Sequence, residues 1–226
     1  MTTALLYDIH GNLAALEAVL ADARADRFLL GGDYALFGPW PVDTIHALRA
    51  LPNATWIRGN GERWTASPDQ APVNDVVQGA IAACRKALGP ELVEQLAALQ
   101  EQTVHDRVRY CHASPISDVR SFMPEPAEDE RELLAAVVER RLVFGHTHLP
   151  FHRVSVDGIE LINPGSVGMP FDGDSRAAYA LLREDGAIEH RRVAYDHAAS
   201  AAAVRERFEG AKWTETAARR ISTARI

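Results

Sequence analysis

The stretch ALLYDIHGN, residues 4–12, sets the pattern that the first part of the chain follows. Its four leading apolar residues predict a short buried strand. The polar residues Asp8 and His10 come directly after that strand. Asn12 precedes apolar residues at helical spacing over 13–20, so it is the expected N-cap of a helix.

The same order of strand, polar loop and helix appears again further along the chain. A strand predicted over 27–30 ends shortly before Asp33, a helix is predicted over 41–51, and a strand predicted over 54–57 ends shortly before Asn60. This alternation is typical of βαβ units and of a largely parallel sheet. Since ligand sites in such sheets lie outside the carboxyl ends of the strands, the polar residues after the strands are expected to meet.

Residues 62–102 are predicted to be helical, in contrast to the alternation before them. Two helices are expected, over about 74–88 and 91–99, because Gly89-Pro90 breaks the pattern between them. We interpret this segment as a helical insertion or cap within a single domain that spans residues 1–226. The alternative is a pair of helices that simply cover the core.

The second half of the chain is expected to be rich in β-structure. A helix is predicted over 128–140, before a strand at 141–144, and a polar, alanine-rich helix is predicted over 198–209. The last dozen residues are expected to be mobile. The remaining strands are predicted at 103–107, 108–111, 151–156, 159–162, 177–182 and 188–193.

Composition narrows the classes of function. The net charge of −7 disfavours a broad nucleic-acid groove, whereas small phosphorylated substrates fit if bound metal ions reverse the local field.

Cys84 and Cys111 form neither a disulfide framework nor a CxxC metal site, so reduced thiols and a cytoplasmic location are expected. No apolar run approaches the roughly 20 residues that span a bilayer. An exposed hairpin edge would allow a homo-oligomer, although nothing in the pattern requires one.

The polar residues after the strands have the chemistry of metal ligands. Asp, His and Asn supply the oxygen and imidazole ligands that suit Mn, Fe, Zn or Ni. Asp-x-His and His-x-His each point alternate side chains to the same side of an extended segment. Two ions about 3.5–4 Å apart can clamp a phosphoryl group and activate a water molecule. The seven candidate ligands are Asp8, His10, Asp33, Asn60, His112, His146 and His148.

The ordered motifs at 8–12, 31–33, 59–60, 112 and 145–148 resemble the calcineurin-like metallophosphoesterase superfamily. The spacing and the later motif at 163–168 are similar to its small bacterial and archaeal phosphodiesterase branch, and the likeness extends to about Leu182. The resemblance implies an α/β fold, a four-layer α/β/β/α sandwich with a helical insertion. It also implies phosphate esters as substrates and Mn²⁺ as a frequent activating ion. It assigns Asp8, His10 and His148 to one metal, Asn60, His112 and His146 to the other, and Asp33 to a bridge between them.

One departure from the family pattern concerns proton transfer. Many members follow the Gly-Asn of the third motif with a histidine, whereas Gly61 stands there in this chain. His10 is therefore the candidate to protonate the leaving group, in addition to binding metal. Arg58 is a candidate phosphate contact, and Asn12 is weighed as a substrate contact against its role as a helix cap. The expected catalytic residues are His10, Asp33, Asn60 and Arg58, and the expected substrate contacts are Asn12 and Arg58.

These residues predict a hydrolase with two divalent metal ions, Mn first, with Fe, Zn or Ni as alternatives. The expected reaction is attack of a metal-bridging hydroxide on a small phosphodiester or phosphomonoester. Protein phosphatases and dinucleoside polyphosphate hydrolases share this type of site. A metal-binding scaffold without activity is the alternative from a different functional class.

Overall fold

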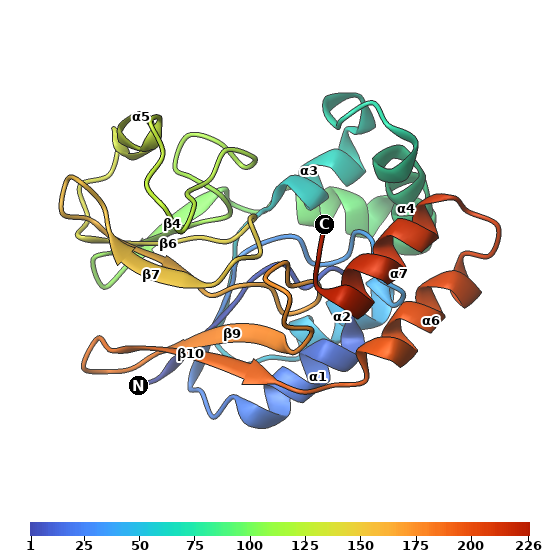
Figure 1. The fold of residues 1–226 in the computed structure, drawn as a ribbon, viewed down its shortest axis with the longest axis horizontal. Helices are drawn as coiled ribbons and strands as arrows, with labels where there is room; N and C mark the ends of the chain where they lie inside the picture. The colour runs from blue at the N-terminus through green and yellow to red at the C-terminus, as the bar shows by residue number, and fades with distance from the viewer.

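Two five-stranded sheets lie face to face in the computed structural model, which describes residues 1–226 (Figure 1). The first sheet has the strand order β10-β9-β1-β2-β3, with β1, β2 and β3 parallel and β9 and β10 antiparallel to their neighbours. These strands are β1 (Thr3–Leu6), β2 (Arg27–Leu30), β3 (Ala54–Trp56), β9 (Ala177–Leu182) and β10 (Ile188–Val193). The predicted parallel centre of the sheet is confirmed.

The second sheet has the order β4-β5-β6-β8-β7. Its central strands β5, β6 and β8 are parallel, and β4 and β7 pair antiparallel at the two edges. The strands are β4 (Gln102–His105), β5 (Val108–Cys111), β6 (Arg141–Val143), β7 (Phe151–Val154) and β8 (Glu160–Asn163). Both sheets therefore present the carboxyl ends of parallel strands.

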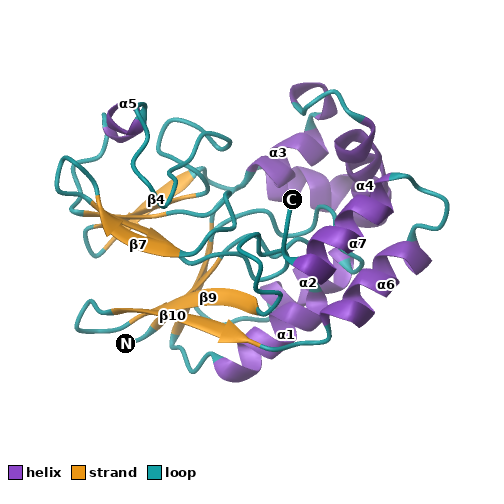
Figure 2. Cartoon of the chain, in the orientation of Figure 1, coloured by secondary structure: helices purple, strands orange, loops and turns teal.

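Most helices gather on the outer face of the first sheet, and a single short helix covers the second (Figure 2). The short helix is α5 (Glu130–Leu134). A 3₁₀ turn over Pro68–Gln70 joins α3 to α4, and α4 packs against both α2 and α7. The helices on the first sheet are α1 (Leu13–Asp22), α2 (Pro41–Arg49), α3 (Asn60–Ala66), α4 (Asp75–Ala97), α6 (His197–Arg207) and α7 (Trp213–Thr223).

Three apolar clusters separate these layers. In β1, Leu6 faces the helices and belongs to a cluster of 33 buried residues, whereas Leu5 faces the other sheet in a cluster of nine. In β6, Val143 belongs to that same inter-sheet cluster, and its neighbour Leu142 packs outward with Leu133 of α5. Alternate residues of a strand point to opposite faces, so continuous apolar strands are buried on both sides. The implied α/β/β/α order is confirmed, with a thin outer layer at α5.

Two expected features of the helices are wrong. The helix predicted over 128–140 ends at Leu134, since its first turn buries Leu133 and Leu134 while Val138, 89% exposed, has nothing to pack against. The last dozen residues are ordered as most of α7, in which Trp213 and Ile221 are buried. By contrast, the expected break in α4 is confirmed, because Gly89 has a φ of 75° within it.

Helix α7 is anchored by close packing against α4. A Cβ atom at Gly79 would lie 2.8 Å from Cδ1 of Trp213, so the absence of a side chain there makes room for the indole ring. None of the helices combines the length and the apolar composition that crossing a bilayer requires.

We expect Trp213→Ala to lower the free energy of unfolding by about 3–5 kcal/mol, because the change removes a buried indole and leaves a cavity beside α4. Urea denaturation of the purified protein measures it. The control Glu215→Ala, also in α7, removes an exposed ion pair with Arg205 of α6 and should change stability by less than about 1 kcal/mol. Equal effects of the two substitutions would mean that α7 does not contribute to the core.

Candidate metal centre

The parallel pairing of β1 with β2 brings the first two predicted ligands to one edge of the sheet. Leu6 pairs with Leu30, so Asp8 and Asp33, two and three residues further on, leave the sheet side by side. Asn60 follows β3 as the first residue of α3. In the second sheet, Tyr110 pairs with Val143, which places His112 and the loop with His146 and His148 at the facing edge.

Five of the seven predicted ligands have backbone conformations that non-glycine residues seldom adopt. Their φ angles are positive: 53° for Asp8, 51° for His10, 56° for Asp33, 68° for His146 and 60° for His148. Strain of this kind persists only where the surrounding structure imposes it, and it concentrates at functional sites. The loops are thus bent to turn these side chains toward a common point.

Backbone carbonyl groups fix the orientation of three imidazole rings. Nδ1 of His10 lies 2.9 Å from the carbonyl oxygen of Leu36, Nδ1 of His112 lies 2.8 Å from that of Gly31, and Nδ1 of His148 bonds that of Met169. A carbonyl oxygen can only accept, so each Nδ1 carries the proton and each Nε2 keeps a free lone pair. This is the arrangement in which a second partner orients a metal-binding histidine.

Two of these free nitrogens, those of His10 and His148, face each other. Nε2 of His10 lies 3.1 Å from Nε2 of His148, and both side chains are buried. Protonation does not relieve the repulsion, because burial lowers the pKa of His10 to about 3 and that of His148 well below its usual value. A bound cation between the two lone pairs would relieve it.

A second group of ligand atoms surrounds Asn60. The amide position of Asn60 that faces the centre lies 2.9 Å from Nε2 of His112 and 2.8 Å from Nδ1 of His146. Burial lowers the pKa of His146 to about 3, so its ring is neutral at physiological pH. With its oxygen at this position, the Asn60 amide would join the two imidazole nitrogens as a third ligand.

The two carboxylates lie between these groups. Asp8 accepts a hydrogen bond at Oδ2 from the backbone N–H of His146, whereas its buried Oδ1 has no partner and lies 3.5 Å from Nε2 of His148. Asp33 directs Oδ1 toward Nε2 of His112 at 3.5 Å and Oδ2 toward Nε2 of His10 at 3.9 Å. Burial raises the pKa of Asp8 to about 8 and that of Asp33 well above its usual value. Buried carboxylates facing neutral imidazoles are a donor set that divalent ions fit.

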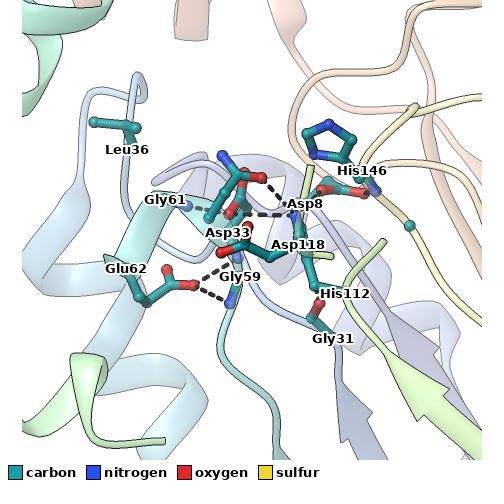
Figure 3. A network of polar contacts seen from close by, with 12 residues as sticks. Asp8, Gly31, Asp33, Leu36, Gly59, Gly61, Glu62, His112, Asp118 and His146 are labelled. Carbon is teal, nitrogen blue, oxygen red and sulfur yellow. Dashed lines mark hydrogen bonds and ion pairs between the residues drawn. The ribbon is translucent and has the colours of Figure 1, made fainter. Parts of the chain in front are cut away.

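Glu62, which is not among the site residues predicted from the sequence, supports this centre. Its Oε2 accepts hydrogen bonds from the backbone N–H groups of Asp33 and Gly59 at 2.9 and 2.8 Å (Figure 3). Its Oε1 accepts one from the backbone N–H of Tyr34 at 2.8 Å. One buried carboxylate thus holds the loops of Asp33 and Asn60 together. Its spacing of three residues from Gly59, the pattern of a capping box, was the available signal.

The loop at 163–169 supports the ligand loops from the other side. Asn163, weighed above only through its motif, donates from Nδ2 to the carbonyl oxygen of Gly145 and to Oγ1 of Thr147. Ser166 donates to the carbonyl oxygen of Asp8 at 2.6 Å, and Gly168 donates its N–H to the same oxygen. The motif therefore positions the residues around Asp8 and His148.

Asn12 and His10 make contacts that compete with two of their expected roles. Asn12 is fully buried, caps α1 by accepting from the N–H of Ala15, and also bonds Gly168, Tyr195 and Ser200, so it has no free group for a substrate. For His10, metal binding and protonation of a leaving group would compete for one free nitrogen. Its Nδ1 is committed to Leu36, which leaves only the nitrogen that faces His148.

Gly61, where a catalytic histidine stands in many relatives, lies against the Asp33 carboxylate. Its N–H donates to Oδ1 of Asp33 at 2.6 Å, and a Cβ atom on it would lie 2.8 Å from the same oxygen. Any side chain at this position would push Asp33 away. The exchange of histidine for glycine therefore fits the local position of Asp33.

A cleft of about 380 Å³ opens beside His112 and is lined by Arg58, the predicted phosphate contact, and by Arg63. The Arg58 guanidinium bonds Glu101 and the carbonyl oxygen of Ala97. Arg63 makes a two-pronged ion pair with Asp118, with both N–O distances 2.6 Å. These pairs place two arginine side chains at the mouth of the centre.

Comparison with known proteins agrees with this geometry. The profile of the calcineurin-like phosphoesterase superfamily domain matches residues 1–186. The uncharacterized protein MJ0912 of Methanocaldococcus jannaschii is 30% identical over 219 residues, 85% of this chain and 87% of that protein. The crystal structure of a metallophosphoesterase from Sphaerobacter thermophilus is similar with a TM-score of 0.84 and 28% identity, over 99% of this chain and 100% of that one. The hypothetical protein PH1004 from Pyrococcus horikoshii OT3 shares the fold, with a TM-score of 0.86 and 21% identity, over 99% and 98% of the two chains.

We expect Glu62→Gln to weaken Mn²⁺ binding by about 10–100-fold, because an amide would direct its own N–H₂ at backbone N–H groups and release the Asp33 loop. Titration calorimetry of the metal-free protein with Mn²⁺ gives the affinity, and circular dichroism verifies folding. The control Glu101→Gln makes the same chemical change on the cleft wall. A folded Glu62→Gln protein with wild-type affinity would refute this positioning role.

Proposed function

Because the chain belongs to the calcineurin-like phosphoesterase superfamily, we propose that it is a dinuclear metal-dependent phosphoesterase that hydrolyses small phosphodiesters or phosphomonoesters. The observation that carries the proposal is the facing lone pairs of His10 and His148, 3.1 Å apart and buried. Two neutral imidazoles held in that way by backbone carbonyls are stable only with a cation between them.

The ligand groups divide between two ions. Asp8, His10 and His148 would hold one ion, since one ligand atom from each lies within 4.8 Å of the others. Asn60, His112 and His146 would hold the second. Asp33 would bridge, because one of its carboxylate oxygens faces each group. Oxygen and imidazole ligands suit Mn, Fe, Zn or Ni, and we propose Mn²⁺ first because the resemblance to the superfamily implies it.

The residues of the chain would position the substrate around these ions. Two bound divalent ions supply Lewis acidity toward the phosphate and lower the pKa of a nearby water. Glu62 keeps the Asp33 and Asn60 loops in register, and Arg58 and Arg63 offer positive charge at the cleft wall. The cleft volume of about 380 Å³ suits a small phosphoester rather than a folded protein substrate. The Gly61 position carries no proton donor, so the leaving group would take its proton from water.

We expect the Mn²⁺-loaded protein to hydrolyse bis-p-nitrophenyl phosphate or p-nitrophenyl phosphate, measured by the release of p-nitrophenolate. Asp33→Asn should lower kcat/KM by at least about 100-fold, because it removes charge between both ion sites. The exposed carboxylate Asp129 provides the matched control, and Asp129→Asn should retain activity. A protein with bound metal that turns over neither compound would refute the hydrolase and favour a scaffold.

The division into two ion sites has its own test, which is metal content by elemental analysis. His148→Asn and His112→Asn should each lose one of the two ions and keep the other, since each removes a ligand from a different group. His105→Asn, at an exposed position of β4, should lose neither. Simultaneous loss of all metal in both variants would contradict separate sites.

A further inference from the structure

Arg220 has an unusual environment for an arginine. It lies in α7, beyond the residues that the family profile matches, and is half-buried. Its Nε is buried without a hydrogen-bond partner, and no carboxylate forms an ion pair with its guanidinium. A partly desolvated cation without an acceptor is unfavourable, and it marks a group that awaits an anion.

The position of Arg220 connects it to the metal centre. Its Cζ lies 5.8 Å from the centroid of the Phe171 ring, and that ring stacks on His148 with centroids 4.3 Å apart and an interplanar angle of 13°. The end of α7 is tied to the same loop, because Gly173 donates its N–H to the carbonyl oxygen of Ala224 at 3.0 Å. Figure 1 shows the end of the chain beside the loops between the two sheets.

The charges around the centre leave Arg220 free for a ligand. Arg58 and Arg63, on the cleft wall beside His112, are already paired with Glu101 and Asp118. Arg220 contacts the Phe171 ring, which stacks on His148, a ligand of the other group. Arg220 thus lies on the His10 and His148 side of the centre, and the paired arginines lie on the His112 side.

We propose that Arg220 determines specificity by binding a second negatively charged group of the substrate, next to the phosphate held at the metal centre. The proposal rests on the proposed function. Arg220 contacts the Phe171 ring, which stacks on His148, and does not itself contact a metal-binding residue. Its guanidinium is therefore offset from the site of the scissile phosphate. An extended phosphate chain has anionic groups at successive positions along the substrate. The cation–π contact with Phe171 would orient the guanidinium for that group.

Phosphate chains of increasing length test this assignment by direct binding. Orthophosphate, pyrophosphate and tripolyphosphate are titrated calorimetrically into the Mn²⁺-saturated protein, with excess Mn²⁺ in both solutions. The wild-type protein should bind the longer chains more tightly than orthophosphate. Arg220→Gln should reduce this gain in affinity by about tenfold, the size expected for one charge-assisted contact. Arg220→Lys, which keeps the charge, should retain part of the gain.

The control is Arg219→Gln, the same change one residue earlier in α7, where the side chain is exposed and bonds the carbonyl oxygen of Ile226. It should leave the gain with chain length unchanged. Equal gains in wild type, Arg220→Gln and Arg219→Gln, or no gain in wild type, would overturn the proposal. These outcomes do not depend on turnover. An Arg220-dependent gain in a protein without hydrolytic activity would refute the proposed hydrolase alone, whereas an active enzyme without that gain would refute the role of Arg220 alone.

Discussion

Two unprotonated imidazole nitrogens, on His10 and His148, face each other at 3.1 Å in a buried environment, and much of the local structure serves to hold them there. Neither ring can turn away, because each donates its other N–H to a backbone carbonyl. Both rings are neutral near pH 7, because burial lowers the pKa of both. The arrangement is therefore unstable by itself and requires a cation, which ties the geometry of the loops to metal binding.

The backbone strain of the ligand loops arises from the same need to hold the ligand atoms together. A ligand loop that leaves a parallel strand continues away from the sheet unless the chain reverses quickly, and positive φ angles at Asp8, Asp33 and His148 provide that reversal. Glycine would adopt those angles without strain but supplies no ligand atom. The cost is offset by contacts that fix each loop, chiefly the three backbone N–H groups bound by Glu62 and the hydrogen bonds of Ser166 at Asp8. The same buried polar network thus holds the metal ligands in place and offsets the backbone strain of their loops.

The sequence was sufficient for the features that depend on local pattern. Apolar runs located the strands around Asp8, Asp33 and His112, and the order of strands and helices implied that their carboxyl ends would meet. It failed where the deciding contact is distant in the chain. The sequence does not show that Ser200 and Tyr195 bond the Asn12 side chain, or that the carbonyl oxygen of Leu36 accepts the Nδ1 proton of His10. Helix α7 had a readable apolar spacing at Trp213 and Ile221, but alanine-rich surroundings hid it.

The metal centre and Arg220 differ in how freely their residues can be substituted. The ligands of the metal centre follow strands that are buried on both faces, so moving any of them would disturb the apolar clusters above and below. Arg220 is carried by α7, which packs against α4 and α6, and its connection to the centre passes through the single ring of Phe171. A substitution there changes charge beside the substrate without shifting a ligand. Affinity for metal is therefore constrained by the sheets, whereas the choice of substrate can vary through α7 and the loop that holds Phe171.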